Sequence, residues 1–469
     1  MSGRVTKVKR ERTSRIKKEP IDEKIVIKLE DENSLDIIKI ESSSPSPSPS
    51  LSRSPSTDDS FPSTKLSNEA MKYNLDTLNN LLHTLKLSNE LPKYEFTRKP
   101  KLKFRPPPCT VLNLNNINFN YSLNEQIELE DLYFLHYSLI FAKKTVVITG
   151  AGISVNSGIP DFRSSNGLFQ GLSTKSTGSG KNLFDYNVFR NNDSIEKFEK
   201  MIEKLYHLST ISKPSPFHHM INDISKQNRL LRLYTQNIDC LDTELSNLKT
   251  KIPLMSTSDS PKSKSKSKSS LDKKSIPPTI QLHGSIKLMN CSKCNYISDL
   301  NYEYFENRKF GENKLIRSCP SCEEMNSIRQ IAGKRLQNNG ILRPRIVLYN
   351  EFHPDGEIIG SITENDLKNK PDCLIITGTT LKIPGVRRLV KEMAKVVHSN
   401  KGYVIWINID EPSQSIIDYV EYFDLIIVGD CQLIPGLVKL FDYLNPFTQK
   451  NNKKDITIIK NELKKETVV

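Results

Sequence analysis

The stretch Thr145-Val146-Val147-Ile148-Thr149-Gly150-Ala151-Gly152-Ile153-Ser154 decides the fold prediction, because an apolar run leads directly into a glycine-rich turn. The run is strand-sized and lacks the polar alternation of a strand with one face in water. Glycines at its end would let backbone amides approach a pyrophosphate beside a helix N-terminus. A plain tight turn fits the glycines equally well. The stretch therefore predicts a buried parallel strand and makes a nucleotide one of two interpretations.

Similar apolar runs recur along the chain, at residues 231–235, 279–282, 345–349, 373–378, 403–409 and 425–429. Helix-length stretches separate several of them, and a helix is expected before residue 143, where Leu132, Leu135 and Leu139 share one face. The sequence therefore predicts an open, doubly wound, Rossmann-like α/β fold with a parallel sheet covered on both faces.

Two long stretches interrupt this rhythm, and we expect them to form a smaller lobe. The predicted large lobe comprises residues 125–165, 226–284 and 340–445, and the small lobe a helical module at 165–225 and a zinc-ribbon module at 285–340, all within a domain at 110–445. Segments rich in Ser, Pro, Lys and Glu cannot bury enough apolar area to offset chain entropy. We therefore expect a disordered tail at 1–90 with a short amphipathic helix near 75–86, a disordered Lys/Ser insertion at 255–278, and a C-terminal tail at 446–469.

The positive charge of the 469-residue chain is uneven. Residues 1–20 carry eight basic and two acidic residues, and residues 250–275 carry seven and two, so these segments hold 11 of the net +14. The sequence thus disfavours a basic groove across the fold, and attraction to a polyanion would come from the tail and the insertion. No apolar run approaches the roughly 20 residues of a membrane helix. The first thirty residues lack an apolar segment, so we expect no secretory signal and a reducing compartment.

Four of the eight cysteines have metal-ligand spacing. Cys291-x2-Cys294 is followed after 24 residues by Cys319-x2-Cys322, which is the pattern of a tetrahedral four-thiolate zinc site. A closed four-cysteine shell leaves no position for water, so this zinc would be structural and metal-activated water is disfavoured. Four unrelated buried thiols and a nucleic-acid-binding zinc ribbon are the alternatives.

Polar residues follow several of the predicted strands, at the edge where an open α/β sheet binds ligands. They lie in Gly158-Ile159-Pro160-Asp161-Phe162-Arg163-Ser164, Gln236-Asn237-Ile238-Asp239, His283-Gly284 and Gly378-Thr379-Thr380. Gly158 comes six residues after Gly152, so the dehydrogenase fingerprint is not met. Most histidines in such a place are core residues, but the position of His283 at a strand end favours a general base.

Together these motifs resemble those of the sirtuins, the NAD-dependent protein lysine deacylases, across about residues 125–440. The resemblance implies NAD+ as a consumed cosubstrate and one structural Zn2+. It implies that His283 draws a proton from the cofactor ribose, that Asn237 orients ribose and water, and that Asp161 holds the nicotinamide carboxamide. The cofactor-binding residues that it implies are Gly150, Ala151, Gly152, Ile153, Ser154, Gly158, Ile159, Pro160, Asp161, Phe162, Arg163, Phe169, Gln236, Asn237, Ile238, Asp239, Gly378, Thr379, Thr380, Asn408, Ile409, Asp410 and Cys431.

Residues 343–351 resemble the segment that lines the acyl-lysine tunnel, which implies substrate contacts at Val347, Tyr349, Asn350 and Glu351. The usual Phe-Gly-Glu is Tyr349-Asn350-Glu351 here, and the usual Gly-Thr-Ser is Gly378-Thr379-Thr380. Loss of a glycine where a peptide lies close predicts a narrower choice of substrates.

These variants, with the tail and the insertion, most resemble the fungal nuclear sirtuins that deacetylate histone. The resemblance implies a nuclear protein whose partner is acetylated histone or the nucleosome, with a role in chromatin silencing and genome maintenance. DNA contact through the Lys/Ser loop and the basic tail is a further hypothesis, and a solvated tether is its alternative. A mono-ADP-ribosyltransferase and a catalytically idle NAD-binding chromatin module remain alternative functions.

Overall fold

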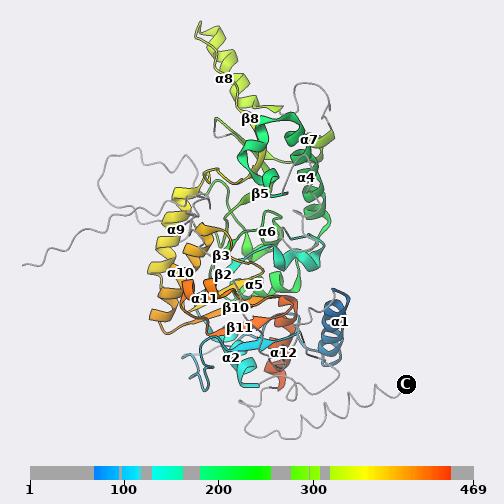
Figure 1. Ribbon diagram of the computed structural model, residues 1–469, viewed down its shortest axis with the longest axis vertical. Helices are drawn as coiled ribbons and strands as arrows, with labels where there is room; N and C mark the ends of the chain where they lie inside the picture. Colours follow the sequence, from blue (N-terminus) through cyan, green and yellow to red (C-terminus); the bar gives the residue numbers. More distant parts are fainter. Residues whose placement is uncertain are drawn as a thin grey trace, which may run out of the picture.

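The computed structural model describes residues 68–94, 98–115, 117, 129–161, 180–254, 276–294, 296–306 and 317–444. They form a large lobe around a seven-stranded sheet and a small lobe around a four-stranded sheet, in the lower and upper parts of Figure 1. The tail before residue 68, most of the Lys/Ser insertion and the C-terminal tail lie outside the described residues. Among the described helices, none combines the length and apolar character needed to cross a bilayer.

The seven strands of the large sheet are all parallel and lie in the order β1-β11-β10-β9-β2-β3-β4. They are β1 (Val111–Asn113), β2 (Thr145–Thr149), β3 (Leu230–Thr235), β4 (Thr279–Gln281), β9 (Cys373–Thr377), β10 (Tyr403–Asn408) and β11 (Leu425–Val428). The chain runs outward from β2 through β3 to β4, then returns to β9 on the other side of β2. The strand order therefore reverses between β2 and β9, which is where such sheets bind ligands.

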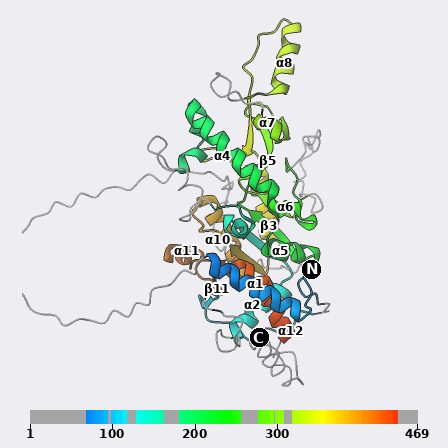
Figure 2. The same cartoon turned by 90° about the vertical axis from the view of Figure 1, so that its right-hand side faces the viewer.

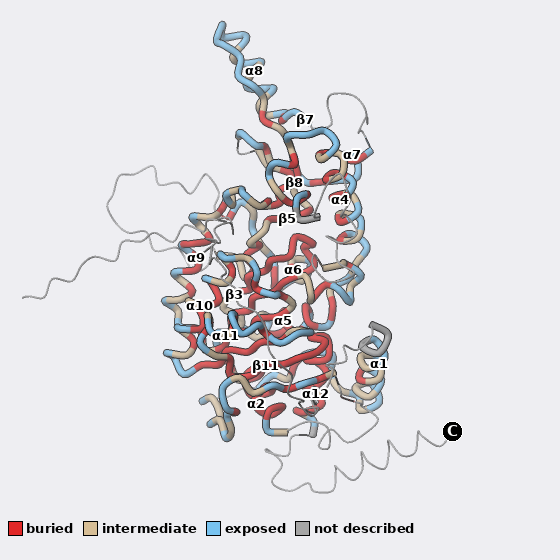
Figure 3. Tube along the Cα trace, viewed as in Figure 1, coloured by how far each residue is buried: buried red, intermediate tan, exposed pale blue. Residues whose placement is uncertain are grey.

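Both faces of this sheet are covered by helices, as the apolar runs predict. Side chains alternate along β2, so Val147 packs into one core while Val146 and Ile148 pack into the other. Helices α1 (Asn68–Thr84), α2 (Leu129–Phe141), α5 (Pro216–Lys226) and α12 (Ile434–Leu444) cover the first face, and α9 (Gly356–Lys368), α10 (Pro384–Ser399) and α11 (Gln414–Val420) the second. Figure 2 shows α1, α2 and α12 together, and Figure 3 shows the buried sheet between the layers.

The small lobe has its own core, between α4 (Asn192–Ile211) and an antiparallel sheet of order β6-β5-β8-β7. Its strands are β5 (Gly284–Cys291), β6 (Ile297–Asp299), β7 (Arg317–Ser318) and β8 (Ile341–Ile346), and its other helices are α7 (Tyr302–Glu306), α8 (Pro320–Ile331), η3 (Gly180–Phe184) and η4 (Tyr186–Arg190). The remaining short helices are α6 (Leu241–Glu244), η2 (Ala151–Ser157), η5 (Ser246–Leu248) and η7 (Cys431–Leu433). Helix α8 projects from this lobe and buries none of its residues (Figure 3).

Two segments lie elsewhere than the sequence predicts. The apolar run at 345–349, expected in the parallel sheet, begins in the last two residues of β8 and continues past its end, and β8 pairs antiparallel with β5 in the small lobe. Helix α5, expected in the small lobe, places Phe217 and Ile221 in the core of the large sheet. Local apolar pattern shows that a segment is buried, but the choice of sheet depends on partners far away in sequence.

Helix α1 is held to the large lobe by Leu78, which is fully buried against Gly436 of α12. We expect Leu78→Ala to lower the free energy of unfolding by about 3 kcal/mol, because it removes a buried side chain and leaves a cavity. Urea denaturation measures this change, and Asp76→Ala, at an exposed position of the same helix, is the control. A loss below about 1 kcal/mol would show that α1 is not anchored by this contact.

Candidate functional site

Two glycine-rich loops meet at the point where the strand order reverses. The Gly150 amide donates to the Thr377 carbonyl at 3.0 Å, and the Gly152 amide donates to the Gly378 carbonyl at 2.9 Å. A Cβ on Gly152 would lie 2.7 Å from the Gly378 Cα, which no side chain tolerates. The sequence left two interpretations of these glycines, close approach of a pyrophosphate and a plain tight turn. In the structure these glycines also allow the loops after β2 and β9 to pack backbone against backbone.

The loop after β2 continues into η2, a 3-10 helix that ends at Gly158 in the left-handed conformation, with φ of 88°. Ile153 and Ser154 are buried in it, and Ile159 is buried just beyond it. Asp161 is half-buried at the end of this described segment. Phe162, Arg163 and Phe169, predicted to bind the cofactor, lie outside the described residues.

The loop after β3 brings a buried amide pair to the same edge. Gln236 donates from Nε2 to the Thr379 Oγ1 at 3.0 Å, which joins the loops after β3 and β9. Asn237 donates from Nδ2 to the Ser154 Oγ at 3.2 Å, which joins β3 to η2. The Asn237 Oδ1 is buried and has no hydrogen-bond partner among the described residues. A buried acceptor without a partner is costly, so this oxygen is suited to receive a ligand hydroxyl.

Asp239 follows this pair in the loop after β3, and its carboxylate is buried and bonded within the protein. It is 6% exposed, and its Oδ1 accepts from the Leu241 amide at 3.0 Å. Burial, together with the nearby Asp242, raises the pKa of Asp239. Its neighbour Ile238 is also buried and packs into the core of the small lobe.

His283 follows β4 and has a defined orientation. Its Nδ1 lies 3.0 Å from the Gln236 carbonyl oxygen, which can only accept, so the proton of the neutral ring sits on Nδ1. The lone pair is therefore on Nε2, as a general base requires. The His283 carbonyl accepts from the Val347 amide at 3.0 Å, which ties this histidine to the segment after β8.

The loops after β10 and β11 complete the edge. The Asn408 Nδ2 donates to the Thr379 carbonyl at 3.0 Å, and the Gly429 amide donates to the Asn408 carbonyl at 2.8 Å. Ile409, Asp410 and Thr380 are exposed beside them. Cys431 is buried, and burial raises the pKa of its thiol well above the usual range. Its thiol is therefore neutral, in agreement with a packing role.

The predicted substrate segment, from Val347 to Glu351, is held by hydrogen bonds to the small lobe and within the segment itself. Tyr349 pairs with the small lobe, since its amide donates to the Phe184 carbonyl at 2.7 Å. Asn350 is exposed and has φ of 63°, a conformation that asparagine tolerates better than most residues, so it can adopt the backbone that a glycine would have there. Glu351 accepts from Arg343 and from the Leu348 amide. Its carboxylate is therefore bound within the protein, which the sequence did not indicate.

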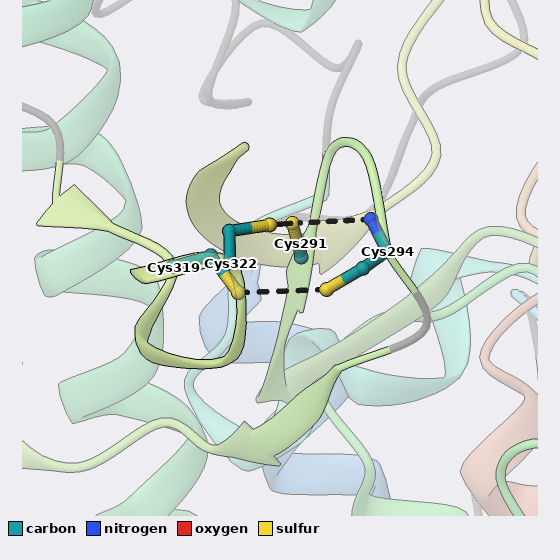
Figure 4. Close-up of side chains that lie close together, drawn as sticks. All are labelled: Cys291, Cys294, Cys319 and Cys322. Carbon is teal, nitrogen blue, oxygen red and sulfur yellow. Dashed lines mark hydrogen bonds between the residues drawn. The ribbon is translucent and has the colours of Figure 1, made fainter. Parts of the chain in front are cut away.

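The four cysteines with metal-ligand spacing come together in the small lobe (Figure 4), with their sulfur atoms all within 4.8 Å of one another. Cys291 and Cys322 have sulfur atoms 3.7 Å apart, and those of Cys294 and Cys319 are 3.5 Å apart. A tetrahedral zinc with sulfur ligands at about 2.3 Å requires sulfur separations of about 3.8 Å. Backbone amides of Cys294 and Lys293 also donate to the Cys291 sulfur. The donor set therefore fits a structural zinc ion.

Sequence reasoning missed two buried groups behind the site. His218 accepts from the Ser215 amide at its Nδ1, and its Nε2 lies 3.7 Å from the Asp242 Oδ1. Gln432 donates to the Ile153 carbonyl at 3.0 Å and accepts from the Phe217 amide at 2.9 Å, so it joins η2 to α5. The contact of His218 could have been predicted from the sequence, because Ser215 and His218 have the spacing of a capping box. No sequence signal predicts the role of Gln432, because its partners are distant in sequence.

Comparison with protein families matches the Sir2 family over residues 150–250 and 271–385. The Saccharomyces cerevisiae protein NAD-dependent histone deacetylase HST4 is 43% identical over 367 residues, which cover 77% of this chain and 93% of that protein. The chain belongs to the Sir2 family. The sequence prediction of a sirtuin with a Rossmann-like sheet is therefore confirmed.

Two further similarities accompany this match. The Schizosaccharomyces pombe NAD-dependent protein deacetylase hst4 is 45% identical over 312 residues, which cover 66% of this chain and 68% of that protein. A crystal structure of a Sir2 homologue in complex with NAD is 20% identical, with a TM-score of 0.45, and the match covers 66% of this chain and 94% of that one.

The cysteine cluster leads to a metal-removal prediction. We expect Cys291→Ser to release zinc and to abolish cooperative unfolding of the small lobe, because the ion supplies folding free energy to a small core. Bound zinc measured by elemental analysis and a thermal unfolding curve check this together. Cys109→Ser, outside the cluster, is the control. A Cys291→Ser protein that keeps one zinc per chain and its full thermal stability would contradict the assignment.

The buried His218 leads to a pH prediction. Burial lowers its pKa from 6.5 to about 4, so its contribution to stability is complete above pH 6.5 and is lost as the pH falls toward 4. His218→Gln keeps a capping acceptor but cannot titrate. From pH 6 to 4.5, we expect the stability difference to move in favour of the variant by about 1.4 kcal/mol per pH unit. Urea denaturation across this range measures it, with the exposed neighbour His219→Gln as control. A constant difference would contradict the buried, neutral histidine.

Proposed function

We propose that this chain is an NAD-dependent protein lysine deacetylase that acts on acetylated histone, releases nicotinamide and transfers the acetyl group to ADP-ribose. The observation that carries the proposal is His283, oriented as a base at the point of the sheet where ligands bind. The relatives point the same way, since HST4 of Saccharomyces cerevisiae is named as an NAD-dependent histone deacetylase. A nuclear location and a role in chromatin silencing and genome maintenance belong to the same proposal.

The residues present fit NAD+ at the edge of the large sheet. Among the described residues no group bonds to the buried Asn237 Oδ1, which gives one acceptor for a hydroxyl, and the loops after β2, β9, β10 and β11 lie at the same edge of the sheet. When bound, NAD+ supplies an electrophilic ribose carbon whose bond to nicotinamide breaks. Asp161, at the end of the loop after η2, is proposed to hold the nicotinamide carboxamide. Val347 and Tyr349 are proposed to contact the acyl-lysine, with Asn350 and Glu351 beside them.

The proposed chemistry of this chain rests on His283 and Asn237. The bond from His283 Nδ1 to the Gln236 carbonyl places the lone pair on Nε2, and this is the atom proposed to accept a proton from a ribose hydroxyl. The Asn237 Nδ2 donates to Ser154, and its Oδ1, which no other described residue bonds, can orient that hydroxyl or a water molecule. Both side chains sit on strand ends, which hold them in place before a ligand arrives.

The test of this function is loss of activity at His283. We expect His283→Ala to lower kcat for nicotinamide release from acetylated histone peptides by at least about 100-fold, because the base is lost. Asn237→Ala is expected to reduce kcat similarly. Binding of NAD+ should largely persist in His283→Ala, which calorimetry can measure.

His219→Ala, at an exposed histidine of the same lobe, is the matched control and should keep its activity. Full activity in His283→Ala would exclude this histidine as the base. Mass spectrometry of the products also separates the two transfer reactions. Acetylated ADP-ribose with a deacetylated peptide supports the proposal, whereas ADP-ribose attached to the protein substrate would contradict it.

The Lys/Ser insertion supports a finer proposal, that nucleosomal DNA is a further partner. Its lysines and those of the basic tail supply most of the net charge, and such contacts depend on salt. Deletion of residues 256–275 is expected to weaken activity on nucleosomes at low salt and to leave activity on short peptides intact. Equal loss on both substrates would overturn the DNA contact.

A further inference from the structure

A group of lysines lies at the edge of the large sheet opposite the loops proposed to bind NAD+. Strands β10, β9 and β2 are parallel neighbours, so their amino ends meet at one edge. Lys143 and Lys144 directly precede β2, Lys370 comes shortly before β9, and Lys401 shortly before β10. All four side chains are exposed. These four lysines, here called the basic edge, therefore stand at the starts of three adjacent strands, about 4.8 Å from one strand to the next.

Hydrogen bonds join the turns that carry the basic edge. The Asp372 carboxylate accepts from the Lys143 amide at 3.0 Å and from the Lys144 amide at 2.7 Å, which ties the start of β2 to the turn before β9. The Asn400 Nδ2, in the turn before β10, donates to the Lys370 carbonyl at 3.1 Å. The backbone of the basic edge is therefore held in place across all three strands.

Carboxylates do not neutralise the basic edge. Asp372 lies 3.8 Å from the Lys99 Nζ, and the buried Asp424 pairs with Arg105. Among the described residues, no carboxylate forms a salt bridge with any of the four lysines of the basic edge. The net charge of the sequence did not indicate this edge, because a sum over the chain does not show which cations the fold gathers.

Two lysines of the basic edge occupy backbone positions that favour glycine. Lys370 has φ of 53° and Lys401 has φ of 57°, each just after the cap that ends α9 or α10. Glycine is the usual residue at such a position, because it carries no Cβ. A cation near a helix C-terminus also interacts favourably with the helix dipole, but Lys368 and His398 already supply one in the last turns of α9 and α10. The two left-handed lysines therefore point to a role other than folding.

We propose that the basic edge binds the phosphate backbone of duplex DNA. Exposed cations held on one edge match a partner with dense, regular negative charge. The basic edge includes none of the exposed large apolar side chains of the described residues, so a protein partner would find no apolar anchor on it. DNA bound here leaves the opposite, ligand edge of the sheet open. This site is separate from the Lys/Ser insertion and consists of residues of the folded large lobe.

The test uses the full-length chain and a fluorescent duplex of about 20 base pairs, with binding followed by anisotropy between about 50 and 200 mM salt. The double variant Lys370→Gly, Lys401→Gly removes two cations and relieves two left-handed side chains. We expect its affinity for the duplex to fall by about tenfold at 100 mM salt, and the slope of log K against log salt to become shallower by about 1.8. The free energy of unfolding, measured in urea, should stay the same or rise.

A second variant and a control separate DNA contact from changes in the backbone. Lys143→Gln leaves the backbone conformation unaltered and should make the slope shallower by about 0.9. The control, Lys204→Gln with Lys213→Gln, removes two exposed lysines at and just after α4 and should keep its affinity within about twofold. The insertion and the basic tail are present in every protein, so the differences report the basic edge alone.

Unchanged affinity and slope in both the double glycine variant and Lys143→Gln would overturn the proposal. An equal loss in the Lys204→Gln, Lys213→Gln control would also overturn it, because the total charge alone would then decide binding. Phosphatidylserine vesicles or a polyglutamate peptide that bind as tightly as the duplex, with the same dependence on the basic edge, would replace DNA by a membrane surface or an acidic protein.

Discussion

The ligand side of the large sheet depends on the close backbone contact between the loops after β2 and β9. With Gly152 and Gly378 packed together, Thr379 lies where Gln236 can bond to it, and the Gln236 carbonyl then orients His283. The His283 carbonyl in turn receives the Val347 amide. A continuous line of hydrogen bonds therefore runs from the glycines to the segment proposed to hold the substrate. A side chain on either glycine would separate the loops and displace every later member of this line.

The rigidity of the large sheet suits it to carry His283 and Asn237, the residues proposed for the chemistry. This sheet is buried on both faces, so the strand ends are held by two separate cores, one on each face. A proposed base such as His283, whose ring orientation depends on one carbonyl oxygen, needs that rigidity. The small lobe has a single core of its own and its four-cysteine cluster. A small core gains much of its folding free energy from a metal ion, and the donor set here can supply it.

The sequence predicted the strands of the large sheet other than β1, because each of these is a short, mainly apolar run, whereas β1 is three residues long and exposes two of them. The local sequence pattern did not predict which sheet a buried segment joins, because that depends on strands distant in the sequence. The run at 345–349 has the composition of a parallel strand, but β8 pairs with β5, which begins directly after His283. The four-cysteine site was predictable, because the spacing of its ligands can be recognised in the sequence alone. The role of Gln432 was not predictable, because its hydrogen-bond partners, Ile153 and Phe217, are distant in sequence and meet it only in the folded chain.

The placement of β8 in the small lobe has a functional consequence. The proposed base and the proposed substrate segment come from different lobes, since His283 and Asn237 stand on the large sheet while the segment after β8 leaves the small one. The two are joined by the bond from the Val347 amide to the His283 carbonyl and by the bond from the His353 Nε2 to the Gln281 carbonyl. Residues along this segment can therefore change without disturbing the base. Asn350 illustrates this freedom, because its backbone conformation suits a glycine while its side chain bonds to Asp185 of the small lobe. Selectivity can thus evolve along this segment while the hydrogen-bonded line that orients the base stays fixed.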